Sequence, residues 1–245
     1  MSGHSKWANI KHRKGAQDAA KAKQFTKAGR EIVVAAKAGG GDPDANARLR
    51  AAIAAARDVN MPKDRIEAAI KKGVGGGLGA NYEEVVYEGH GPSGVAVIAN
   101  VLTDNRNRTA SEMRFLFSRY GGELGVPGCV SWMFDRKGYI EIPADGVEEE
   151  KLMEVVLEAG GDDVRLEGDV FEVYAAPESF ENVREAVEKA GIKVAKGEVA
   201  MIPKNLVRVE GKKAESLLSL LEALDDHDDV QKVAANCDID ESVGA

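Results

Sequence analysis

The chain has 245 residues, of which 44% are hydrophobic, with a mean hydropathy of -0.29 and a formal net charge of -8 at pH 7. No apolar run approaches the roughly 20 residues that span a bilayer, and the first residues lack the apolar stretch of a secretory signal. These features predict a cytoplasmic protein without a membrane anchor. The two cysteines, Cys129 and Cys237, form neither a metal-ligand spacing nor a disulfide framework.

Charge is distributed unevenly along the chain. Residues 1–73 contain sixteen Lys and Arg against seven Asp and Glu, a net charge of +9, whereas residues 74–245 carry -17. The first thirty residues alone carry +7. The basic residues 1–73 (the head) are therefore expected to contact a polyanion. The acidic residues 74–245 (the body) should repel a nucleic acid and so limit how it docks on the head.

Residues 1–15 show neither helical nor alternating periodicity and are predicted to form a flexible basic arm. Cations in such an arm contact phosphates, and an aromatic ring among them can stack on a base. The alternative is a tail without a partner, or a tryptophan that packs onto the helices behind it. The arm residues predicted to bind nucleic acid are Lys6, Trp7, Lys11, His12, Arg13 and Lys14.

Three helices are predicted to follow and to form a small bundle. Residues 16–37 are rich in Ala and Lys, and Gly39 to Gly41 should stop this first helix. Asp42 and Pro43 have the pattern of an N-cap and first helical residue, and Met61-Pro62-Lys63 opens a third helix that should end at Gly73. The first helix extends the predicted nucleic-acid surface through Lys21, Lys23, Lys27 and Arg30.

Residues 73–79 are rich in glycine but are predicted to be a linker. They follow a helix rather than a strand, and they lack the Gly-Lys-Ser/Thr ending of a phosphate-binding loop. The helical head should therefore be joined to the body by a flexible connection.

The next stretch predicts strands at residues 82–89 and 95–103, a polar loop at 103–109, and a helix capped by Thr109 and Glu112. A further strand is expected at 130–134. The loop is either a polar connection stabilised by turn hydrogen bonds or a rigidly mounted set of donors for phosphate or RNA backbone. Its candidate nucleic-acid ligands are Asn105, Arg106, Asn107 and Arg108.

From residue 139 the pattern becomes strand 139–142, helix 147–159, strands 163–166 and 170–174, helix 180–190 and strand 192–202. This βαββαβ order is typical of a ferredoxin-like domain. A strand at 205–210, a helix at 212–224 and a strand at 230–235 would then complete the sheet begun at residue 82. The expected fold is α+β with three domains: a basic arm plus three-helix bundle at 1–76, a discontinuous middle domain at 77–134 and 205–245, and an inserted ferredoxin-like domain at 135–204.

No catalytic or metal-binding pattern is evident. The four histidines lie far from any Cys or Ser in a recognisable signature, and the acidic run at 225–229 lacks calcium-loop spacing, so it is interpreted as a solvated helix end. We therefore predict no enzyme, no catalytic residues, no metal, no cofactor and no small-molecule substrate. A remote alternative is a phosphate-handling enzyme that uses Asp104 and Arg106.

Three motifs resemble the YebC/PmpR family, which includes the mitochondrial translational activator of cytochrome c oxidase. They are the opening segment 2–14, the segment Tyr87-Glu88-Gly89 with Gly91-Pro92, and residues 103–109. The resemblance covers essentially the whole chain. It implies a three-domain α+β protein of the bacterial cytoplasm, and it carries two functional descriptions: probable transcriptional regulators that bind DNA, and translation factors that associate with the ribosome and assist difficult nascent sequences such as proline runs.

The residues themselves distinguish the DNA-binding description from the ribosomal one only in part. No helix-turn-helix, zinc finger or basic zipper is present to read a major groove, and phosphate contacts position a protein without specifying sequence. We expect a non-enzymatic nucleic-acid-binding regulator of transcription, with a ribosomal-RNA-binding translation factor as the alternative. An acidic body suits a folded RNA surface better than a long duplex.

Overall fold

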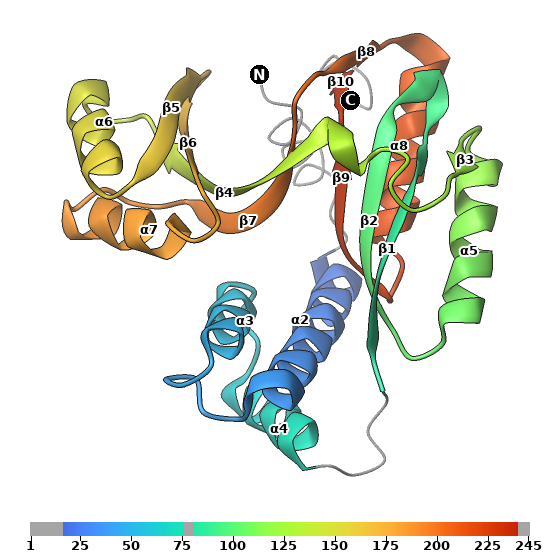
Figure 1. Cartoon of the computed structure of the whole chain (residues 1–245), viewed down its shortest axis with the longest axis horizontal. Coiled ribbons are helices and arrows are strands. Elements are labelled where there is room, and N and C mark those ends of the chain that lie inside the picture. The colour runs from blue at the N-terminus through green and yellow to red at the C-terminus, as the bar shows by residue number, and fades with distance from the viewer. Residues whose placement is uncertain (1–16, 76–80, 240–245) are drawn as a thin grey trace.

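The computed structural model describes residues 17–75 and 81–239, whose helices and strands are labelled in Figure 1. It contains a helical bundle, a middle α/β domain built from two stretches of sequence, and a ferredoxin-like domain inserted between those stretches. The predicted fold class is thereby confirmed. No helix in the two described ranges is both long and apolar enough to cross a membrane.

The N-terminal bundle consists of α2 (Gln17–Gly39), α3 (Ala47–Asp58) and α4 (Lys63–Val74). Apolar side chains recur along one stripe of each helix and meet in the middle of the bundle. This core includes Ile32, Leu49, Ile53 and Ile66.

Two predicted helix ends in the bundle are wrong. The N-cap of α3 is Asn46, whose Oδ1 accepts a hydrogen bond from the Leu49 N–H at 3.0 Å, rather than Asp42. Gly73 is not the C-cap of α4 but lies inside the helix, where a Cβ would come within 2.6 Å of the Val33 carbonyl. A glycine is therefore needed there because α4 packs directly against the α2 backbone.

The middle domain has a four-stranded antiparallel sheet in the order β3 (Glu123–Leu124), β1 (Glu83–His90), β2 (Ala96–Thr103), β9 (Val230–Ala235). Two helices, α5 (Arg106–Arg119) and α8 (Gly211–Asp225), cover one face of the sheet. The last strand thus comes from the far end of the chain. The side chains that join the helices to the sheet include Val97, Met113, Phe117 and Leu221.

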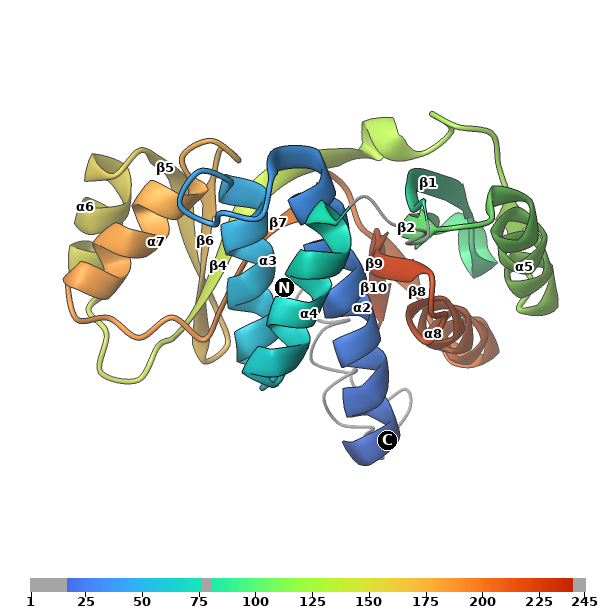
Figure 2. The same ribbon diagram turned by 90° about the horizontal axis from the view of Figure 1, so that it is seen from below.

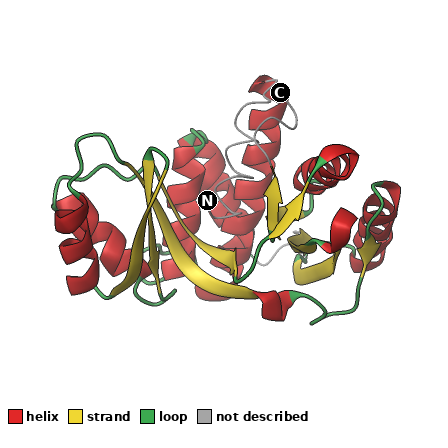
Figure 3. Ribbon diagram, turned by 90° about the horizontal axis from the view of Figure 1, so that it is seen from above, coloured by secondary structure: helices red, strands yellow, loops and turns green. Residues whose placement is uncertain are grey.

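Smaller elements complete the middle domain. The short helix η1 (Pro92–Gly94) makes the turn between β1 and β2, and β8 (Val207–Val209) pairs in parallel with β10 (Cys237–Ile239) as a separate ribbon. The strand predicted at 130–134 is wrong, because residues 131–133 form the short helix η2 (Ser131–Met133) and the next strand begins at Phe134. Figure 3 shows η2 in red at the end of that strand.

The inserted domain has the sheet order β7 (Lys196–Pro203), β4 (Phe134–Pro143), β6 (Val170–Ala175), β5 (Gly161–Glu167), with every neighbouring pair antiparallel. Helices α6 (Glu149–Glu158) and α7 (Phe180–Lys189) pack on one face of this sheet. The order of elements and strands is that of a ferredoxin-like fold.

The middle domain contacts both of the other domains, the bundle through the Arg48–Glu84 pair and the inserted domain through an apolar cluster. Met133 and Met201 pack beneath the middle sheet with Ile98 and Ala234, and Lys232 donates to the Glu198 carboxylate at 2.6 Å. Seen from below, the bundle lies between the other two domains and α5 lies at the outer edge of the molecule (Figure 2). The residue boundaries given above for the domains stay a prediction.

Candidate nucleic-acid interface

The polar segment 103–109, predicted to be a loop before a helix capped by Thr109, is largely the first turn of α5. The helix begins at Arg106, and the N-cap is Asn105, whose Oδ1 accepts from the Arg108 N–H at 3.1 Å. Asparagine is among the strongest N-cap residues, and here it acts four residues earlier than the predicted cap. The predicted cap at Thr109 and the predicted loop over residues 106–109 are therefore wrong.

The buried carboxylate of Asp229 joins α2, α5 and the loop before β9. Its Oδ1 accepts from Arg30 at 2.7 Å, and its Oδ2 accepts from Arg108 at 2.8 Å and from the Thr109 hydroxyl at 2.7 Å. Burial opposes ionisation of Asp229, but hydrogen bonds from Thr109, Arg108 and Arg30 outweigh it and lower the pKa to about 2. The side chains of Arg108 and Thr109 are therefore used in structural hydrogen bonds to Asp229.

The acidic run at 225–229 receives the cations of α2. Lys23 pairs with Asp226 at 3.1 Å, Lys27 donates to the carbonyl of Asp225, and Arg30 also donates to the carbonyl of Asp228 at 2.5 Å. The run lies at the end of α8, and Asp226 and Asp228 are exposed as the interpretation of a solvated helix end requires, but Asp229 is buried and the run also forms the surface on which the basic helix docks. Three cations predicted to contact nucleic acid therefore contact anionic oxygens of the chain itself.

The remaining predicted ligands divide into three groups. Lys21 is exposed on α2, and Arg106 and Asn107 are exposed in the first turn of α5, whereas Asn105 is used as the N-cap. The backbone carbonyl of Arg106 accepts from the Tyr87 hydroxyl at 3.3 Å. The predicted arm residues Lys6, Trp7, Lys11, His12, Arg13 and Lys14 lie outside the described residues.

The exposed face of α5 continues beyond the predicted segment and was missed from the sequence. Among the described residues, no carboxylate lies within 4.0 Å of Arg106, Arg114 or Arg119, although the chain as a whole is acidic. The sequence does contain the signal for this face, because Met113, Leu116 and Phe117 are spaced as the apolar side of a helix and the opposite side follows from the same period. That outer face consists of Asn107, Ser111, Arg114, Phe115, Ser118 and Arg119.

A second exposed feature is the loop between β3 and β4, whose backbone is hydrogen-bonded to the side chain of Glu88. This carboxylate is only 6% exposed and accepts from the backbone N–H groups of Gly128, Val130 and Ser131 at 2.8, 2.9 and 2.8 Å. Burial opposes its ionisation, but these hydrogen bonds dominate and lower the pKa of Glu88. The loop presents Trp132, whose indole N–H donates to the Cys129 carbonyl at 3.1 Å.

Close packing explains why the last residue of the Tyr-Glu-Gly motif, at position 89, is glycine. A Cβ there would lie 2.5 Å from the Glu123 carbonyl and 2.7 Å from the Phe117 ring. Only glycine lets β3 and α5 approach β1 this closely. The motif therefore positions both the loop and α5.

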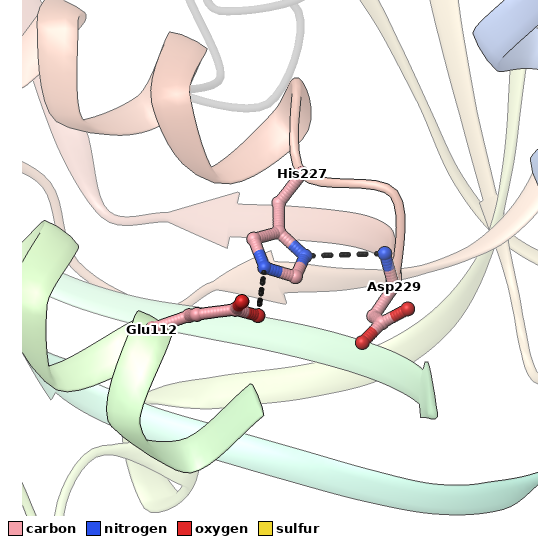
Figure 4. Close-up of side chains that lie close together, drawn as sticks. All are labelled: Glu112, His227 and Asp229. Atoms are coloured by element: carbon pink, nitrogen blue, oxygen red, sulfur yellow. Dashed lines mark hydrogen bonds and ion pairs between the residues drawn. The ribbon is translucent and has the colours of Figure 1, made fainter. Parts of the chain in front are cut away.

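One group of side chains in the described part of the chain has the composition of a metal site, namely Glu112, His227 and Asp229 (Figure 4). The His227 Nδ1 accepts from the Asp229 N–H at 3.1 Å, and Nε2 donates to Glu112 at 2.9 Å. Both oxygens of Asp229 already accept from Arg30, Arg108 and Thr109, and two guanidinium groups at under 3 Å disfavour a cation. The group acts as a hydrogen-bonded strut between α5 and the loop before β9.

Aromatic residues on a ferredoxin-like sheet can stack on RNA bases, but those of this sheet are covered. Tyr139 and Tyr174 are neighbours at 5.7 Å between ring centroids and are 0% and 3% exposed. Their hydroxyls donate to the buried Glu172 at 3.1 and 2.6 Å. This pair stabilises the inserted domain and does not offer an exposed stacking surface.

Comparison with known proteins gives full-length matches. Residues 5–76 match the family described as TACO1/YebC protein N-terminal domain, and residues 82–237 match TACO1/YebC second and third domain. A relative from Desulfosudis oleivorans is 55% identical, covering 100% of this chain and 99% of its own length, and one from Carboxydothermus hydrogenoformans is 53% identical, covering 98% and 99%. Both are called "Probable transcriptional regulatory protein".

A solved structure agrees with these matches. The crystal structure of a conserved hypothetical protein from Aquifex aeolicus is 46% identical and has a TM-score of 0.84, covering 95% of this chain and 96% of that one. The fold, the three motifs and the full-length relatives point to a single conclusion. The chain belongs to the TACO1/YebC family.

Proposed function

We propose that this protein is a non-enzymatic regulator of gene expression that acts in the cytoplasm by binding nucleic acid. The observation that carries the proposal is a set of exposed arginines on α5: Arg114 and Arg119 of its outer face and Arg106 of its first turn have no carboxylate within 4.0 Å among the described residues. In a chain of net charge -8, such a cationic surface is complementary to the phosphates of a nucleic acid. The relatives' name, probable transcriptional regulatory protein, supports the same class.

The relatives' name implies DNA as the target. A second candidate, a factor that binds ribosomal RNA and relieves stalling at proline-rich nascent sequences, is favoured by the charge of the inserted domain. Residues 135–204 contain eighteen Asp and Glu against nine Lys and Arg. Such a domain repels a duplex that extends past α5, whereas a locally folded RNA can present phosphates to α5 alone.

The enzyme alternative required Asp104 and Arg106 to act together on a phosphate. Asp104 accepts from Arg108 at 3.1 Å, so its carboxylate is paired with a structural arginine rather than placed beside Arg106. An acid or base that assists phosphate chemistry has to face the bound phosphate. The 103–109 segment therefore supports binding better than catalysis.

Replacing Arg106, Arg114 and Arg119 together by Ala is expected to weaken nucleic-acid binding and to flatten its salt dependence. Each lost phosphate contact lowers the slope of log affinity against log salt by about 0.7–0.9, so three contacts lower it by about 2 to 3. Fluorescence anisotropy of a labelled 20-mer across a salt series measures both quantities.

The matched control removes three exposed lysines from the inserted domain, Lys151, Lys189 and Lys193, each replaced by Ala. This variant should bind as the wild type does. Equal slopes in the α5 variant and the wild type would contradict the proposal for α5. A parallel Lys11→Ala, Arg13→Ala, Lys14→Ala variant measures the separate contribution expected of the basic arm.

A further inference from the structure

An aromatic ring stands in the middle of the cationic face of α5. Phe115 is 58% exposed, and the Arg119 guanidinium carbon lies 5.8 Å from its ring centroid. Arg119 also lies 5.7 Å from the ring centroid of Tyr120, so its guanidinium contacts both rings. Such contacts hold a guanidinium and a ring in a defined relative orientation.

The neighbours of Phe115 on the outer side of α5 are polar or charged rather than apolar, and the carboxylate of Glu112, three residues earlier, pairs with His227 and Arg108. Arg114 precedes it, and Ser111 and Ser118 lie one turn before and after it on the same face. An exposed phenylalanine without apolar neighbours does not belong to the core, which lies on the opposite side of α5 around Met113 and Phe117. It is suited to a flat apolar group that arrives together with negative charge.

We propose that α5 binds an unpaired nucleotide, with its base stacked on Phe115 and the flanking phosphates bound by Arg114 and Arg119. This inference rests on the proposed function and names the form of nucleic acid that α5 selects. In a duplex the faces of the bases are already stacked on one another, so a protein ring cannot reach them without unpairing. A base in a single strand, loop or bulge offers its face freely.

The same surface does not fit a second copy of this chain or another protein equally well. A stable protein interface buries about 800 Å² on each partner, and a single ring among arginines provides little apolar area. Two copies would also bring like charges together. The combination of one ring and flanking cations is instead the pattern of single-stranded nucleic-acid binders.

The test uses the full-length chain and fluorescence anisotropy with a mixed-sequence RNA 20-mer, its DNA equivalent and a matched DNA duplex. Phe115→Ala should weaken binding of the single strands by about 5- to 150-fold, the range for one base–aromatic stack, and should change duplex binding by less than about twofold. Phe115→Trp should restore binding, because tryptophan retains a stacking surface.

Leu157→Ala is the matched control, because Leu157 is 53% exposed on the acidic helix α6 and its loss should change neither binding nor stability. An equal loss for duplex and single strands, or no loss in Phe115→Ala, overturns the inference while nucleic-acid binding itself stands. If the wild type binds none of the three nucleic acids, both the inference and the proposed function fail. Both also fail if Phe115→Ala abolishes the capture of a protein and nothing else. Thermal melts of each variant separate a binding effect from unfolding.

Discussion

Asp229→Asn is expected to lower the free energy of unfolding by about 3 kcal/mol and to loosen the docking of the N-terminal bundle. The side chain of Asp229 is 3% exposed and is the shared acceptor for Arg30 of the bundle and Arg108 of α5. An amide of the same size keeps the shape but leaves Arg30 without its counter-charge and removes from Arg108 the buried one of its carboxylate partners, leaving Asp104 and Glu112. Urea denaturation of the two proteins measures the difference.

The matched control lies three residues earlier. Asp226 is 71% exposed and pairs with Lys23 at 3.1 Å, so Asp226→Asn should change stability by less than about 1 kcal/mol. A similar small change in Asp229→Asn would contradict the structural role of Asp229.

The pH dependence gives an independent readout of the same prediction. The pKa of Asp229 is lowered from 3.8 to about 2, so its contribution to stability is present above pH 3.8 and is lost as the pH falls towards 2. The stability difference between wild type and Asp229→Asn should therefore shrink over this range. A difference that stays constant down to pH 2 would show that the carboxylate charge is not what stabilises the junction.

Glu88→Gln is expected to lower the free energy of unfolding by about 2 kcal/mol and to loosen the loop that carries Trp132. The glutamine amide places an N–H₂ donor where one carboxylate oxygen now accepts backbone N–H groups, so at least one buried donor loses its partner. Amide hydrogen exchange of Gly128, Val130 and Ser131 should accelerate, and urea denaturation gives the loss of stability.

The control for Glu88 lies on the same strand. Glu84 pairs with Arg48 on the surface and its side chain is 59% exposed, so Glu84→Gln should leave both exchange and stability nearly unchanged. Because the pKa of Glu88 is lowered in the folded protein, its stabilisation should be present above the ordinary glutamate value and decrease as the medium is acidified. If the three amides exchange at unchanged rates in Glu88→Gln, Glu88 does not stabilise this loop.

Local patterns predicted the regular elements of this fold well. Residues 230–235 were expected to be a strand and form β9 with the same ends, and the βαββαβ order of the inserted domain was readable from alternating and helical periods. Both signals depend on short stretches of side chains, so they are present in the sequence itself. The cap of α5 was predicted at Thr109 because Thr109 and Glu112 have capping-box spacing, whereas Asn105 caps the helix and the Thr109 hydroxyl donates to Asp229.

The candidate site was only partly predictable because its decisive contacts are distant in sequence. Arg30 and Asp229 are 199 positions apart, and nothing local indicates that the acidic run at 225–229 complements the cations of α2. Arg108 was grouped with Arg106 because they are two positions apart, yet a helix turns them to different sides. Asn107 lies on the outer face of α5 with Arg114, Phe115 and Arg119, and Arg106 is exposed in the first turn of the helix.

The most direct test of the account is photocrosslinking in living cells from the outer face of α5. A photoreactive residue at Ser118, exposed beside Phe115 and Arg114, is compared with one at Lys151, exposed on the acidic helix α6. The account predicts covalently attached nucleic acid from position 118 and none from position 151, and sequencing then assigns it to ribosomal RNA or genomic DNA. Crosslinks from position 118 to proteins alone, or equal nucleic-acid yields from both positions, would contradict it.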